Sequence, residues 1–174
     1  MPYTGIVLTI LSLHAAAFLI LLGHWLVAAG MFPKAVPAFA EVYDRRPIRA
    51  TLLGLVTYGP LFLLLLSSGN IGNGLVKLLA LAAGFTALLL GFIGSAGLAL
   101  RIGRNLSADT NQWHQVLRGG AMLALVFITP VLGSLFLLHI GLASGFGAVL
   151  LSRPWRSKVA APAALAETPE PALS

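Results

Sequence analysis

Four long stretches of the chain contain no aspartate, glutamate, lysine or arginine, and this pattern constrains the fold more than any other feature. They are Met1–Pro33, Ala50–Val76, Leu78–Leu100 and Gly119–Ser152. A helix needs about 20 apolar residues to cross the roughly 30 Å of hydrocarbon in a membrane, and each stretch is that long. Charged residues are 9% of the chain, against about 25% in an ordinary soluble domain. The sequence therefore predicts an all-α integral membrane protein.

The net charge of +6 does not indicate a nucleic-acid partner, because the basic residues do not form one patch. They lie singly or in small groups just outside the apolar stretches, where the charges that set membrane topology are found. The lipid bilayer is therefore the expected partner of this chain. There is no cysteine, which excludes thiolate nucleophiles and cysteine-ligated metals.

The first three stretches predict helices at about Thr4–Met31, Ile48–Leu66 and Leu75–Ile102. Between the last two, the segment Ser67–Gly74 is rich in glycine, serine and asparagine, which is typical of a tight turn. The second and third helices should therefore form an antiparallel hairpin. The loop Phe32–Arg49 has apolar residues near helical spacing, which predicts a short helix lying on the membrane surface.

The last stretch, Gly119–Ser152, is too long for one span, because a helix of that length covers about 50 Å. Pro130 and Gly133 near its middle mark a kink or a turn. A turn gives two short helices, Gln112–Thr129 and Leu135–Ser152, and a bundle of five transmembrane helices in all. A kink gives four transmembrane helices, of which the last is long and kinked.

The distribution of basic residues favours five helices. With five, every lysine and arginine except Lys77 falls on one side of the membrane, as the positive-inside rule requires. With four, the distribution is more even. The expected location is the cytoplasmic membrane of a bacterium, with the N-terminus outside and the C-terminus inside. The residues expected to set topology and face lipid headgroups are Arg45, Arg46, Arg49, Arg101, Arg104, Arg118, Arg153, Arg156 and Lys158.

The chain length allows one membrane bundle, predicted to comprise residues 1–158, and leaves no room for a sizeable soluble domain. The tail, residues 159–174, is rich in alanine and proline and has no apolar face that could pack. A segment of that composition is predicted to be disordered.

Small residues recur every four positions on the third predicted helix, and the last stretch contains a GxxxG pair. Such a stripe forms a smooth groove in which another membrane helix can approach closely. The functional interpretation is an interface for a partner protein or a second copy of the chain; the alternative is packing within the bundle. The residues concerned are Ala83, Ala87, Gly91, Ser95, Ala99, Gly141 and Gly145.

Four histidines are the residues best suited to bind a cofactor: His14, His24, His114 and His139. Paired histidines on different helices would be needed to hold haem b. Counted along the predicted helices, no two histidines on different helices lie at the same depth inside the membrane. We therefore expect no cofactor and no metal site.

Five aromatic residues fall near the ends of predicted spans: Trp25, Trp113, Trp155, Tyr43 and Tyr3. This position is typical of the aromatic belts at membrane–water interfaces, and we expect these side chains to lie there. The aromatic residues thus support the predicted spans and imply no binding site.

Ionisable chemistry is sparse, because no acidic residue lies inside any apolar stretch. Proton- and cation-coupled carriers usually need such a group, and Ser95 and Thr129 are among the few polar residues that could line a solute path. Catalytic and nucleotide-binding motifs are absent from the sequence. The sequence predicts a non-catalytic polytopic membrane protein that serves as a scaffold or accessory subunit. The alternatives are a small channel or carrier, and a haem b electron-transfer subunit.

Overall fold

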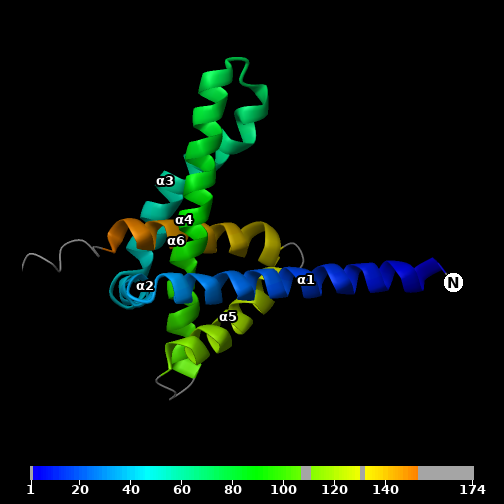
Figure 1. The fold of residues 1–174 in the computed structure, drawn as a ribbon, viewed down its shortest axis with the longest axis vertical. Coiled ribbons are helices and arrows are strands. Elements are labelled where there is room, and N and C mark those ends of the chain that lie inside the picture. The colour runs from blue at the N-terminus through cyan, green and yellow to red at the C-terminus, as the bar shows by residue number, and fades with distance from the viewer. Residues whose placement is uncertain (1, 107–110, 130–131, 153–174) are drawn as a thin grey trace, which may run out of the picture.

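The computed structural model describes residues 2–106, 111–129 and 132–152. Every element in this part of the chain is helical, which confirms the predicted all-α class (Figure 1). Pro130, Arg153, Trp155, Arg156, Lys158 and the predicted tail lie outside the described residues. The elements are α1 (Pro2–Met31), α2 (Ala35–Arg45), α3 (Pro47–Ser67), the 3-10 turn η1 (Ser68–Asn70), α4 (Gly74–Leu106), α5 (Gln112–Ile128), the π-helical turn η2 (Leu132–Leu137) and α6 (Leu138–Leu151).

Within the described residues, four helical segments are long and apolar enough to cross a membrane. They are Thr4–Met31, Pro47–Asn70, Gly74–Leu106 and Leu132–Leu151. Helix α5 has 17 residues, about 25 Å, and is too short to join this set. The structure thus supports four candidate spans, and the fifth span, which α5 would provide, stays a prediction.

Helices α3 and α4 form the predicted antiparallel hairpin. After η1, Ile71 takes up an extended conformation, and the chain then enters α4. The Asn73 side chain accepts hydrogen bonds from the backbone N–H groups of Leu75 and Val76, at 3.0 and 3.3 Å, and so caps the new helix. Pro60 lies inside α3 without ending it.

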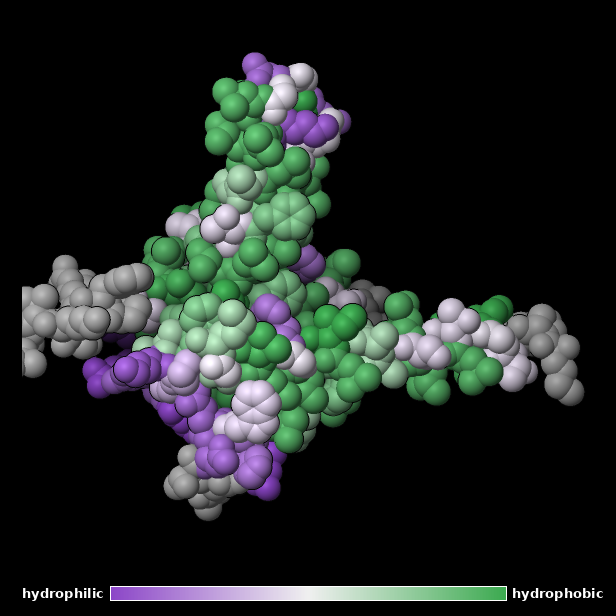
Figure 2. All heavy atoms as spheres, viewed as in Figure 1, coloured by the Kyte–Doolittle hydropathy of each residue, from purple (hydrophilic) through white to green (hydrophobic). Residues whose placement is uncertain are grey.

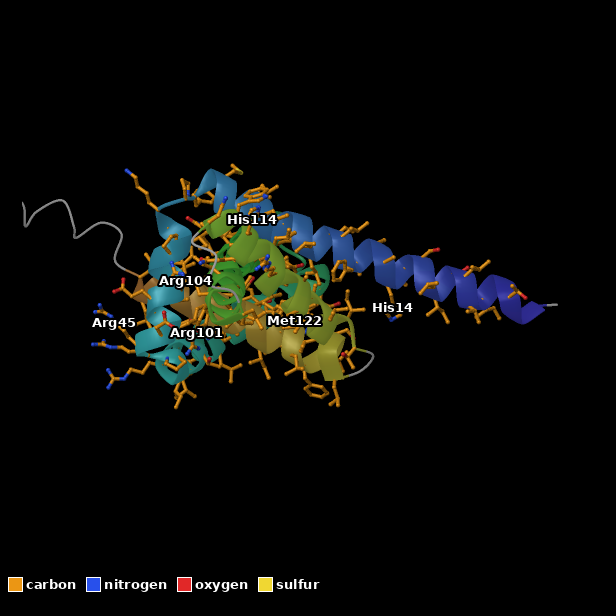
Figure 3. All side chains as sticks on the ribbon, turned by 90° about the horizontal axis from the view of Figure 1, so that it is seen from below. His14, Arg45, Arg101, Arg104, His114 and Met122 are labelled. Atoms are coloured by element: carbon orange, nitrogen blue, oxygen red, sulfur yellow. The ribbon has the colours of Figure 1, made fainter. Side chains whose placement is uncertain are left out.

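Helices α1 and α6 cross α4 instead of running alongside it as α3 does (Figure 1). Figure 1 shows α1 and α6 lying across α4, and Figure 3, turned by 90°, shows α1 again extending sideways from the other helices. Only the C-terminal part of α1 packs against the chain, on α5 and α4. The core therefore lies where α1, α2, α5 and α6 meet the second half of α4.

Helix α2 is present where the sequence predicts a short amphipathic helix, but protein covers its apolar face. Val36, Phe39 and Tyr43 are at most 5% exposed, and α2 packs mainly on α4. Gly97 of α4 permits this approach, because a Cβ atom there would lie 2.9 Å from the backbone nitrogen of Ala40. The predicted short helix is therefore confirmed, its apolar face packs on protein, and its location at the membrane surface stays a prediction.

The last uncharged stretch changes direction near its middle, as the two-helix interpretation predicts (Figure 1). The N–H group of Gly133 donates a hydrogen bond to the Thr129 carbonyl oxygen at 2.9 Å. A Cβ atom at Gly133 would lie 2.8 Å from the carbonyl oxygen of Phe127. Glycine thus allows the chain to turn back closely over the end of α5, so the stretch is not one continuous kinked helix.

Helix α4 continues to Leu106, whereas the sequence predicts its end near Ile102. Gly103 lies directly against the backbone of Gln115 in α5, since a Cβ atom there would lie 2.9 Å from the Gln115 Cα. Packing against α5 extends the helix beyond the apolar residues that suggested its boundary.

Candidate functional site

The predicted stripe of small residues lies at the centre of the molecule. Ala87, Gly91, Ser95 and Ala99 are buried, and Ala83 at the outer end of the stripe is half-buried. Gly141 and Gly145, the predicted GxxxG pair, are also buried, in α6. The small residues thus form the predicted groove along α4. Whether a partner could bind there depends on which helices already occupy it.

Glycines bring α4 and α6 into backbone contact. A Cβ atom at Gly91 would lie 2.7 Å from the carbonyl oxygen of Leu142, and one at Gly145 would lie 2.6 Å from the backbone nitrogen of Ser95. Both separations are shorter than those that real Cβ atoms show. Close approach of this kind supplies the van der Waals contact that holds helices together in lipid.

Helix α5 covers the C-terminal end of the same stripe, at Ala99. A Cβ atom at Gly119 would meet the backbone of Ala99 and would lie only 3.0 Å from its carbonyl carbon. Together, α5 and α6 of the same chain fill the groove that Gly91, Ser95 and Ala99 form on α4. A partner protein or a second copy would therefore have to bind a different surface.

A buried hydrogen bond joins α1 to the stripe. The indole N–H of Trp25 donates to the Ser95 hydroxyl at 2.8 Å, and that hydroxyl donates to the Phe92 carbonyl oxygen at 2.7 Å. Trp25 is 0% exposed, and its ring centroid lies 6.0 Å from that of Phe127. The prediction that Trp25 belongs to an aromatic belt is wrong, because helices α1, α4 and α5 enclose its ring.

Polar contacts hold α2 in place. Arg101, near the end of α4, pairs with Asp44 of α2 at 2.8 Å. Tyr43 is also buried instead of lying in an aromatic belt, and burial raises its pKa to about 12, an effect that the neighbouring Ser144 hydroxyl opposes. Thr51 Oγ1 lies 3.1 Å from Ser144 Oγ, so α3 and α6 meet through hydroxyl groups at the same level.

The other basic residues predicted to face headgroups, where the structure describes them, are exposed. Arg45, Arg46 and Arg49 surround a surface hollow of about 410 Å³ where α2 joins α3. Figure 3 shows Arg45 and Arg104 on the same side of the molecule as Arg101. Arg118 is exposed on α5. Among these residues, the three arginines at the α2–α3 junction form the most concentrated charge.

Three of the four histidines, His14, His24 and His139, pack singly against an aromatic ring or bond to their own helix. His24 lies edge-on to Phe92 with 4.9 Å between ring centroids, and His139 lies edge-on to Phe62 at 5.0 Å. His14 bonds to a carbonyl oxygen one turn back along α1. In the part of the chain that the structure describes, no three His, Asp or Glu side chains come together as a metal site would require.

Both hydroxyls proposed for a solute path make hydrogen bonds inside the protein. Ser95 holds the Trp25 indole, and Thr129 Oγ1 donates to the Leu125 carbonyl oxygen of its own helix at 3.2 Å. Their positions are explained by packing, as is usual for serine and threonine in membrane helices.

Apolar side chains are exposed on every side of α1. Leu8, Leu11, Leu13 and Ile20 are between 58 and 70% exposed, and the most hydrophobic window of this helix contains no buried residue. Figure 2 shows that the projecting helix is largely apolar. A helix that is apolar all round is stable only in lipid or against another protein.

No protein-family model, curated protein sequence or solved structure matches this chain.

Proposed function

We propose that the chain is a multi-pass protein of a bacterial cytoplasmic membrane and acts there as a non-catalytic scaffold or accessory subunit. The observation that carries the proposal is α1, an apolar helix whose N-terminal part has no partner in the described chain. Its exposed leucines are a surface for lipid or for another membrane protein. The proposal that the protein is non-catalytic rests on the sequence, in which no catalytic or nucleotide-binding motif is found.

The arrangement of polar surface supports a membrane location. Figure 2 shows hydrophilic side chains at the α3–α4 turn and again beside α2 and the far end of α4, with a mainly apolar surface between them. Helix α4 is 33 residues long, about 50 Å, with Lys77 near one end and Arg104 near the other. Its length and terminal charges suit a helix that crosses about 30 Å of hydrocarbon with both ends in water.

Five spans, with the N-terminus outside and the C-terminus inside, are part of the proposal. The break between α5 and α6 supports two separate crossings by the last uncharged stretch. Helices α1 and α6 lie across α4, so the three do not run along one axis. The side of the membrane on which each loop lies is therefore tested with reporters.

Two reporters are compared at each site, one that is active only in the cytoplasm and one that is active only outside it. After Lys158 we expect activity from the cytoplasmic reporter alone. At Gly72, in the α3–α4 turn, we expect activity from the outside reporter alone, since one helix separates this turn from the α2–α3 junction, which the proposal places in the cytoplasm. A C-terminal reporter that works outside would overturn five spans and favour four.

The scaffold role is tested by photocrosslinking in intact membranes. A photoreactive residue at Leu13, 68% exposed on α1, is expected to capture a protein, either a second copy or a different subunit. The control position is Leu78, 62% exposed near the α3–α4 turn, which should capture lipid only. If Leu13 also captures only lipid, and the chain purifies as a monomer in mild detergent, the scaffold proposal fails.

A further inference from the structure

The junction between α2 and α3 concentrates positive charge around a hollow. Arg46 leaves helical geometry, with φ −148° and ψ 55°, and Pro47 then begins α3. The hollow of about 410 Å³ is lined by Arg45, Arg46, Pro47, Ile48 and Arg49, all of which are exposed. We call these five residues the basic junction.

Its charge is only partly neutralised within the described residues. Arg45 pairs with Glu41 one turn earlier, at 2.6 Å. Arg46 and Arg49 make no ion pair with any described residue. Three guanidinium groups around one hollow, with one carboxylate beside them, leave an excess of positive charge. Guanidinium groups match the oxygens of a phosphate group in geometry as well as in charge.

An apolar strip begins inside the same hollow. Ile48 lines the hollow and is 72% exposed, and Leu52, Leu55 and Val56 follow it along α3 with 58, 51 and 71% exposed. Their spacing of four, seven and eight residues places them on one face of the helix. A soluble anion would use the arginines alone, whereas a lipid would use both the arginines and the strip.

We propose that the basic junction binds the headgroup phosphate of an anionic phospholipid, whose acyl chain lies along Ile48, Leu52, Leu55 and Val56. The inference rests on the proposed membrane location and adds a specific lipid contact to it. Two other basic residues suit this role less well, because Arg101 is paired with Asp44 and Lys77 lies at the end of α4 far from Arg101. The lipid would fix the α2–α3 junction at the level of the headgroups.

The test measures lipid binding by the full chain, purified in an uncharged mild detergent. Native mass spectrometry with added phosphatidylglycerol or phosphatidylcholine is expected to show preferential retention of the anionic lipid. The double variant R46Q/R49Q should bind phosphatidylglycerol about twenty-five-fold more weakly, since each basic residue near an anionic surface contributes about a factor of five. K77Q, which removes one positive charge at the other end of α4, is the control and should bind as the wild type does.

Three outcomes would overturn the inference. One is equal retention of the two lipids by the wild type, and another is unchanged phosphatidylglycerol binding by a folded R46Q/R49Q variant with a wild-type circular dichroism spectrum. The third is displacement of the lipid by inorganic phosphate at matched concentration, which would indicate a soluble anion as the ligand. Failure of the proposed membrane location is seen separately, as a chain that does not float with lipid vesicles.

Discussion

Replacing Gly145 with alanine tests whether backbone contact between α4 and α6 holds the fold together. The added Cβ atom would overlap the Gly91 carbonyl oxygen and would lie 2.6 Å from the backbone nitrogen of Ser95, whereas ordinary contact begins at 3.4 Å. Both neighbours are backbone atoms that cannot swing aside, so α6 must move away by more than about 0.8 Å, the shortfall at Ser95 alone. Overpacking of this kind costs about 1–3 kcal/mol, and the better helix propensity of alanine returns up to about 1 kcal/mol. We expect G145A to lower the free energy of unfolding by about 1–2 kcal/mol.

The matched control is G23A, because a Cβ atom at Gly23 of α1 meets nothing within 4 Å. This variant gains the same helix propensity without a clash and should be as stable as the wild type or slightly more so. Both variants are unfolded by titrating a denaturing detergent into mild-detergent micelles, with helicity followed by circular dichroism. If G145A and G23A unfold at the same detergent fraction, the α4–α6 contact is not the one described here.

Three further variants test other contacts. S95A leaves the buried Trp25 N–H without an acceptor and should cost about 1–3 kcal/mol in the same titration. D44N removes the partly exposed ion pair with Arg101 and should cost about 1 kcal/mol or less, with a difference from the wild type that shrinks at high salt. The Tyr43 pKa of about 12 lies above the unfolded value near 10, so wild-type stability should be complete below pH 10 and fall as pH rises toward 12. Y43F should lack this fall when unfolding is measured across that range.

Local signals in the sequence predict the positions of the helices well. Uncharged stretches mark α1, α3 and α4, and the glycine- and asparagine-rich segment between the latter two marks their turn. Asn111 caps α5 with its side chain, which is why this helix begins at the predicted residue, Gln112. These features depend on residues close in sequence, so the sequence contains what determines them.

The sequence could not predict whether lipid or protein covers the apolar face of each helix, because both environments favour the same side chains. The apolar face of α2 would suit either, and only Gly97 of α4, under Phe39, indicates a close protein neighbour. Trp25 near a span end is equally compatible with a belt and with a core. The small residues Ala28 and Ala29, both buried on the same helix, were the available sign that α1 packs here.

The same ambiguity explains why the small-residue stripe did not identify its own partner. Small residues such as Gly91 and Ser95 indicate that the backbone of another helix packs closely, but they do not identify that helix or the chain to which it belongs. The structure assigns α6, through Gly145, to that position. The crossing of α1 and α6 over α4 follows from these contacts between residues far apart in the sequence, which no local pattern encodes.

Small residues of this protein pack its helices against one another, whereas large apolar and basic side chains are exposed at its surface. In the described part of the chain, glycines such as Gly91, which contacts Leu142, already pack against another helix of the same chain, so close backbone packing is not available to a partner at those positions. The surface left exposed includes large apolar side chains, on α1 and on other helices, and three arginines at the α2–α3 junction. Large side chains bind through shape and area, and arginines bind through charge. The proposed partner protein on α1 and the proposed anionic lipid at the junction would therefore bind independently, and substitutions at Leu13 and Arg46 should affect the two separately.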